Sequence, residues 1–178
     1  MLKRIGSYLR GVHRDESGNA TVEFAIFAPF FVGLLAFSIE QGHIALRHSM
    51  MERGMDIAVR EIRLGTGTAP THDEIKEIVC SNALFVDNCS TSLRLEMVPS
   101  DPKAFDALDP QADCTDKEEP TKPVRQFTPG QQNQLMLLRT CFKYDPMFPD
   151  SLLGRSLSKD SSGQSAIIAL STFVQEPL

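Results

Sequence analysis

The sequence predicts an α+β protein, in which one long N-terminal α-helix precedes a small domain with a short helix and an antiparallel sheet of about three strands. Three observations lead to this fold class. Residues 20–39 form an apolar run, residues 40–64 continue it as an amphipathic repeat, and three strand-like stretches follow between residues 92 and 174. The 178 residues leave room for one domain after the helix, not two.

The first eighteen residues form a basic leader, with four Lys and Arg side chains against two acids. Basic residues next to an apolar segment stay on the cytoplasmic side of a membrane. The sequence therefore predicts a cytoplasmic N-terminus, with everything after about Arg47 on the other side.

The apolar run can be interpreted in three ways. As a helix its twenty residues span about 30 Å, enough for a hydrocarbon core, which favours a membrane segment. A plain signal anchor would keep it, with Gly18 as the helix N-cap and Glu23 reaching to the interface. A secretory signal would end at the small-x-small site Ala36-Phe37-Ser38 and release a domain beginning at Ile39.

The third interpretation comes from a lone carboxylate. An acidic side chain deep in a bilayer costs about 2.5–3.5 kcal/mol, so a chain that keeps Glu23 in the apolar run is expected to give it a partner. If the chain is cut after Gly18, Glu23 becomes the fifth mature residue. The new α-ammonium of Asn19 then lies within reach of its carboxylate.

The run from Gly18 to Phe24, GNATVEF, resembles the processing site of the Flp subclass of type IV prepilins, in which the cut follows Gly and the fifth and sixth mature residues are Glu and an aromatic. The wider run 18–50 is similar to the TadE-like minor pilins, or pseudopilins, of tight-adherence pilus systems, and so is the ending 172–177. Major Flp pilins typically have Tyr where this chain has Phe24. The resemblance therefore favours an accessory subunit over the bulk pilin.

The resemblance implies cleavage of the Gly18–Asn19 bond by a prepilin peptidase, and Glu23 and Phe24 as the processing and assembly motif. It implies assembly or initiation of an Flp/Tad type IV pilus for adherence and biofilm formation. The implied partners are the other minor pilins, the major Flp pilin, the inner-membrane assembly platform and membrane lipid. The implied location is a single pass of the bacterial inner membrane with a periplasmic domain, or the extracellular pilus. The alternative is a signal-anchored envelope protein whose periplasmic domain binds an unrelated partner.

The helix is expected to run from residue 19 to residue 64, because apolar residues recur at helical spacing beyond the membrane run, at Ile44, Met51, Met55, Ala58 and Ile62. Pro29 removes one backbone hydrogen bond and predicts a kink or a looser turn. Residues 65–70 form a linker of Gly, Thr, Ala and Pro that ends the helix.

Residues 71–178 are the predicted domain. A helix capped by Thr71 or His72 is expected to run to about Phe85. The predicted strands are 92–98, parts of 134–144, and 166–174. Residues 99–130 are rich in Pro and acids and predict an exposed, mobile loop, either a solvated insertion or a contact surface.

Cys80, Cys89, Cys114 and Cys141 all follow the membrane run, on the side where disulfides persist. Three pairings are possible. We prefer Cys80–Cys89, which closes a short loop after the helix, and Cys114–Cys141, which ties the acidic loop to a strand. Zinc is disfavoured, because the sequence has no CxxC motif or close Cys/His cluster.

Catalysis and nucleic-acid binding are not expected. The four histidines are scattered along the chain, and no Ser, Cys or carboxylate pattern joins them. After Gly18 the acids outnumber the bases, twenty-one to fourteen, which leaves no basic surface for nucleic acid. We therefore expect no enzyme activity, cofactor or metal.

Overall fold

The computed structural model describes residues 19–64, 70–101, 103, 109–115 and 126–177. The chain divides into two compact units, one ending at Ile39 and the other running from Glu40 to Leu178. The boundary lies inside α2, a single helix from Asn19 to Leu64. The sequence predicts a boundary after this helix, whereas residues 40–64 belong to the second unit, because their apolar side chains form part of its core. The predicted leader and most of the predicted linker lie outside the described residues.

The second half of α2 forms one wall of that core. Met51, Met55, Ala58 and Ile62 are buried, and Ile44 packs against them. Their spacings of three, four and seven place them on one side of the helix, as the sequence predicts.

The helix α3, from His72 to Asn82, begins with a capping box. The Thr71 hydroxyl accepts a hydrogen bond from the Glu74 N–H, and the Glu74 carboxylate accepts one from the Thr71 N–H. These bonds also hold the pKa of Glu74 below its ordinary value. The helix ends three residues before the predicted Phe85, because the Ala83 N–H closes the last turn on the Val79 carbonyl and Phe85 takes a left-handed φ of 64°.

Two disulfides lie in the described part of the chain, Cys80–Cys89 and Cys114–Cys141, the pairing that the sequence favours. The first joins α3 to a single helical turn, α4, from Cys89 to Ser92. The second joins the segment 109–115 to the middle strand of the sheet. Each bridge therefore fastens an irregular segment to a regular element.

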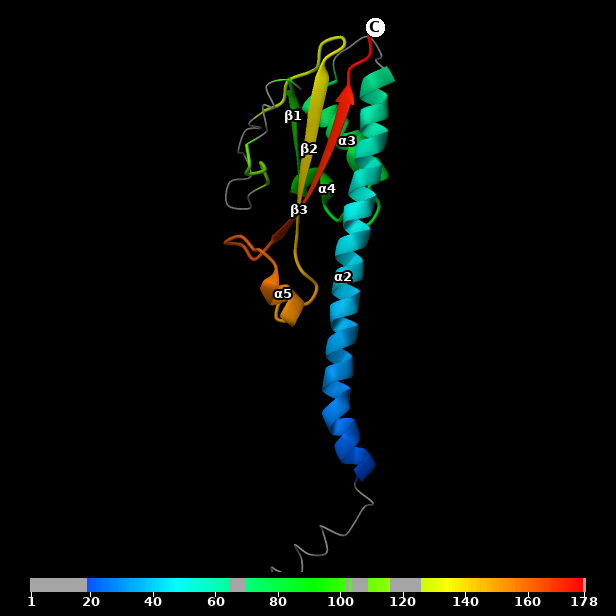
Figure 1. Ribbon diagram of the computed structural model, residues 1–178, viewed down its shortest axis with the longest axis vertical. Coiled ribbons are helices and arrows are strands. Elements are labelled where there is room, and N and C mark those ends of the chain that lie inside the picture. The colour runs from blue at the N-terminus through cyan, green and yellow to red at the C-terminus, as the bar shows by residue number, and fades with distance from the viewer. Residues whose placement is uncertain (1–18, 65–69, 102, 104–108, 116–125, 178) are drawn as a thin grey trace, which may run out of the picture. The chain divides into compact units, whose positions relative to one another are not determined.

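The sheet has three antiparallel strands in the order β1-β2-β3, as Figure 1 shows. They are β1, Leu93–Pro99; β2, Leu135–Tyr144; and β3, Ser165–Val174. Each begins or ends within one residue of its predicted bounds, and the predicted α+β fold class is confirmed. A five-residue helix, α5, from Leu152 to Ser156, lies between β2 and β3 and is not foreseen in the sequence.

One face of the sheet packs against α2 and α3. Its buried residues alternate along each strand, with the pairs Met97–Leu138 and Leu95–Thr140 opposite each other on β1 and β2. The Thr140 hydroxyl lies 3.0 Å from the Met55 sulfur, so this polar group too finds a partner on α2.

The other face of β1 and β2 is covered by an ionic network. Glu96 and Arg139 are opposite each other in register, and the Arg139 Nε donates to the Glu96 carboxylate across 2.7 Å. Arg94 donates to Asp113 across 2.9 Å, and the Asp113 N–H donates to Glu96 across 3.0 Å. All four side chains are buried.

This network corrects the expectation of an exposed loop at residues 99–130 in one part, around Asp113, while most of the other described residues of the segment are exposed. Asp113 is 2% exposed, Cys114 is bound to β2 by its disulfide, and Phe127 bridges to Met97 at the edge of β1. One acid of this segment, Asp113, pairs with Arg94 on the sheet and is buried, whereas Asp101 and Asp109 are exposed. Residues 102, 104–108 and 116–125 of the predicted loop lie outside the described residues.

Candidate functional site

The first unit consists, in its described part, of an apolar helix with its side chains outward. Residues 20–39 of α2 carry exposed Phe, Val, Leu and Ile side chains all around the helix, and the window that qualifies as a membrane span has none of its residues buried. A helix that is hydrophobic all round needs either a protein core or a membrane to cover it. This helix is long and apolar enough to cross a membrane.

The predicted assembly motif lies at the start of this helix. Glu23 and Phe24 are both exposed, Phe24 at 73%, and among the described residues Glu23 forms no ion pair or side-chain hydrogen bond. Gly18 lies outside the described residues, and Asn19 is described only as the first residue of α2. The structure thus places the carboxylate on an apolar helix, one turn after Asn19.

Pro29 lies within α2, and the helix continues through it to Leu64. Proline has no N–H to donate to the preceding turn, so this point of the helix has one hydrogen bond fewer than the rest. Ser38 is also inside the helix, and its hydroxyl donates to the Leu34 carbonyl at 2.8 Å. Such a bond keeps a hydroxyl satisfied within an apolar segment.

Glu40 is the first residue of the second unit and is 1% exposed. Its carboxylate accepts hydrogen bonds from two backbone N–H groups, those of Met147 at 3.2 Å and Phe148 at 2.8 Å. A buried carboxylate needs such donors, because transfer out of water otherwise costs several kcal/mol. The sequence alone suggests only that Glu40 marks the end of the apolar run.

Tyr144 lies near Glu40, and Arg47 lies against the Tyr144 ring. Burial raises the pKa of Tyr144, and the negative charge of Glu40 raises it further, so the phenol stays neutral. The Arg47 guanidinium lies 5.3 Å from the centre of the Tyr144 ring and pairs with Asp87 at 3.4 Å. The end of β2 is therefore fixed to α2 by a carboxylate, an aromatic ring and a cation.

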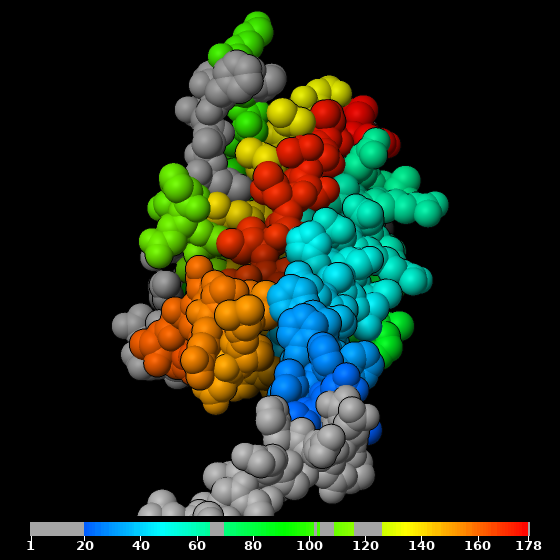
Figure 2. Space-filling view, turned by 60° about the horizontal axis from the view of Figure 1, so that its bottom comes forward, coloured from blue at the N-terminus to red at the C-terminus, as the bar shows by residue number. Residues whose placement is uncertain are grey.

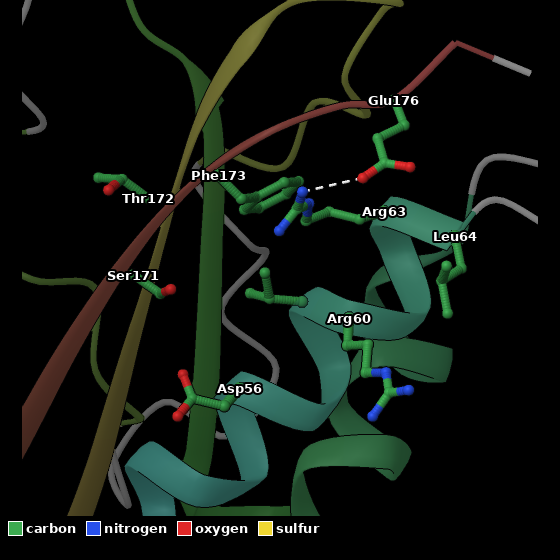
Figure 3. A pocket seen from close by; sticks show the side chains of 9 residues that line it. Asp56, Arg60, Arg63, Leu64, Ser171, Thr172, Phe173 and Glu176 are labelled. Atoms are coloured by element: carbon green, nitrogen blue, oxygen red, sulfur yellow. Dashed lines mark hydrogen bonds and ion pairs between the residues drawn. The ribbon is translucent and has the colours of Figure 1, made fainter.

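A shallow pocket lies between the last turns of α2 and the end of β3. Figure 3 shows Arg63 reaching across it to Glu176, with 2.8 Å between the two groups, while Phe173 points toward the helix and Arg60 points away from β3. The lining also includes Asp56, Leu64, Ser171 and Thr172. It mixes both signs of charge and holds no His or Cys side chain, so it offers no nucleophile activated by a base.

Metal binding has no support in the described ranges either. No group of three or more His, Cys, Asp or Glu side chains is placed there to hold a metal ion. The four cysteines are joined as disulfides and cannot act as thiolates. The features with functional content are therefore the exposed apolar helix with Glu23 and the cluster around Glu40.

Comparison with protein-family models, curated proteins and solved structures found no match for this chain.

Proposed function

We propose that this chain is a TadE-like minor pilin that a prepilin peptidase cuts after Gly18 and that takes part in the assembly or initiation of an Flp-type pilus. The observation that carries the proposal is the exposed carboxylate of Glu23, which has no ion-pair partner among the described residues, on an apolar helix exposed all round. In a bilayer or a filament core such a carboxylate requires a cation. The α-ammonium of a chain that begins at Asn19 supplies it, within one subunit or between neighbours.

The second unit supports the same proposal. Its two disulfides suit an oxidising compartment such as the periplasm, and the basic leader favours a cytoplasmic N-terminus. In this arrangement the chain is a structural subunit and a substrate of the peptidase, and the catalysis belongs to the peptidase. Its helix contacts membrane lipid before assembly and other pilus subunits afterwards.

The test is the intact mass and N-terminal sequence of the protein from membranes of cells with and without the prepilin peptidase. A mature chain beginning at Asn19 only when the peptidase is present supports the proposal. A chain that begins at Met1 in both strains contradicts it and favours a plain signal anchor. A chain that begins at Ile39 would identify a secreted domain and would remove Glu23 from the mature protein.

A further inference from the structure

The segment between β2 and β3 presents a large apolar side chain to solvent. Leu152, the first residue of α5, is 86% exposed, more than any other large hydrophobic side chain among the described residues. Met147, five residues earlier, is 46% exposed. We call residues 145–156 the α5 loop. Isolated exposed apolar residues are common, so position and rigidity decide whether this pair has a role.

The α5 loop is rigid. The Ser151 hydroxyl donates to the Phe148 carbonyl at 2.8 Å and accepts from the Gly154 N–H at 2.9 Å. A side chain at Gly154 would meet the Phe148 carbonyl oxygen at 2.1 Å, so the backbone packs closely on itself. Lys159 donates to the Pro149 carbonyl at 3.0 Å. Leu152 is therefore held outward by a fixed scaffold and does not depend on a flexible loop for its exposure.

The position of the α5 loop follows from Glu40. The hydrogen bonds from Met147 and Phe148 fasten the loop to Glu40, and Glu40 is covalently joined to Ile39, the last residue of the apolar run. Figure 2 shows the loop, in orange, on the surface of the second unit. The α5 loop is therefore hydrogen-bonded to the residue that directly follows the apolar run. If residues 20–39 span a membrane, this residue marks the point where α2 leaves the bilayer.

We propose that the α5 loop rests on the membrane surface, with Leu152 and Met147 inserted between the phospholipids at the headgroup and acyl-chain boundary of the leaflet from which α2 emerges. This inference rests on the proposed function only in requiring that residues 20–39 span a membrane. The exposed charges of the loop are two acids, Asp145 and Asp150, and one base, Arg155, so the loop has no excess of positive charge to attract anionic lipid, and apolar contact selects the surface. Hydrogen bonds to the Glu40 carboxylate hold the loop in place before it meets lipid.

The chain contains no Trp, so a single introduced Trp reports on one position. The full chain is reconstituted in phosphatidylcholine vesicles whose acyl chains carry bromine, a quencher of Trp fluorescence. The test variant is Leu152→Trp. The control is Leu170→Trp, at a leucine that is 59% exposed on β3, and Phe30→Trp in the apolar run reports insertion.

The expected result is blue-shifted emission and strong quenching for Phe30→Trp and Leu152→Trp, with red emission and little quenching for Leu170→Trp. Quenching of Phe30→Trp with no more quenching at Leu152→Trp than at Leu170→Trp overturns the inference and leaves the membrane anchor intact. The absence of quenching at Phe30→Trp overturns both the membrane anchor and the inference about the α5 loop, because the loop then has no bilayer beside it.

Discussion

The Phe148 N–H donates to the carboxylate of Glu40 across 2.8 Å, although 108 positions separate the two residues in the chain. This contact joins the start of the folded unit to the segment before its last strand. It also explains why a carboxylate directly after an apolar run is buried and not exposed at an interface. Two backbone donors replace the water that Glu40 loses.

Glu40→Ala is expected to lower the free energy of unfolding of the second unit by about 2–3 kcal/mol, because two buried N–H groups lose a charged acceptor. Glu40→Gln keeps one acceptor and is expected to lose less. Urea unfolding of the full chain in detergent, followed by near-ultraviolet circular dichroism, measures both. Glu61→Ala, on the exposed side of the same helix, is the control, and equal stability of all the variants would contradict the role of Glu40.

Gly54 lies where α2 passes α3. A side chain there would meet the Val79 carbonyl oxygen at 2.6 Å, so Gly54→Ala is expected to force the helices apart and cost about 1–3 kcal/mol. Gly42 is in the same helix with nothing within 4 Å, so Gly42→Ala is expected to stabilise the unit by about 0.5–1 kcal/mol. Thermal unfolding of the two variants compares them directly. Stabilisation of both variants would show that helix propensity alone decides and would contradict the close contact at Gly54.

The ion pair Glu96–Arg139 is buried on the face of the sheet opposite α2 and α3. Arg139→Met leaves the Glu96 carboxylate without its guanidinium and is expected to cost about 3–5 kcal/mol. The double variant with Glu96→Met removes both charges and is expected to regain part of that loss, although the Asp113 N–H then lacks its acceptor. A double variant that is less stable than Arg139→Met would refute this account. Denaturant unfolding of the parent, the two single variants Arg139→Met and Glu96→Met, and the double variant supplies the cycle.

The pKa of Asp160 lies well below its ordinary value. Although burial raises its pKa, hydrogen bonds from Lys143, from Ser162 and from the Gln164 N–H outweigh that effect and lower it from 3.8 to about 2. A lowered carboxyl pKa stabilises the folded state above the unfolded pKa, and the contribution disappears as the pH falls through the folded pKa.

We therefore expect Asp160→Asn to be less stable than the parent at neutral pH, with the difference shrinking between pH 3.8 and about 2. Unfolding of both chains across this pH range measures it. Asp150→Asn, at an exposed acid of the same region, is the control and should follow the parent. A stability difference that does not depend on pH would assign the effect to packing.

The proposed processing predicts two separate phenotypes. Gly18→Leu is expected to block cleavage, because a side chain prevents close approach of the scissile bond to the peptidase acids. Glu23→Ala is expected to be cleaved and to fail in assembly, because the new ammonium has no partner. Mass measurement of the chain and counting of pili distinguish the two steps. Normal pili with both variants would refute the proposed function.

The first strand, Leu93–Pro99, was predictable because its side chains alternate and Ser92 and Ser100 flank it, and the last strand because residues 166–174 form an apolar run. The short helix α5 was not, since five residues are too few to show a period and its form depends on the Ser151 cap. The burial of Asp113 was also missed. Arg94 and Glu96 on alternate positions of β1 are the signal that could have revealed a charged, covered face.

The candidate site was predictable in its composition and only partly in its placement. The sequence identifies Glu23 as a carboxylate in an apolar run, and the structure places it exposed on α2. The sequence does not identify Glu40 as an anchor, because its partners are backbone groups of Met147 and Phe148, which have no side-chain signature. Contacts through the main chain between distant segments become visible only in three dimensions.

The order of the strands has a consequence for biogenesis. In the sheet β1-β2-β3 each strand pairs with the one that precedes it in the chain, and the α2 wall of the core comes before all three. A chain translocated from its N-terminal to its C-terminal end can therefore add each strand to a free edge as it emerges. No later strand has to be inserted between earlier ones, so folding can keep pace with the export that the proposed function requires.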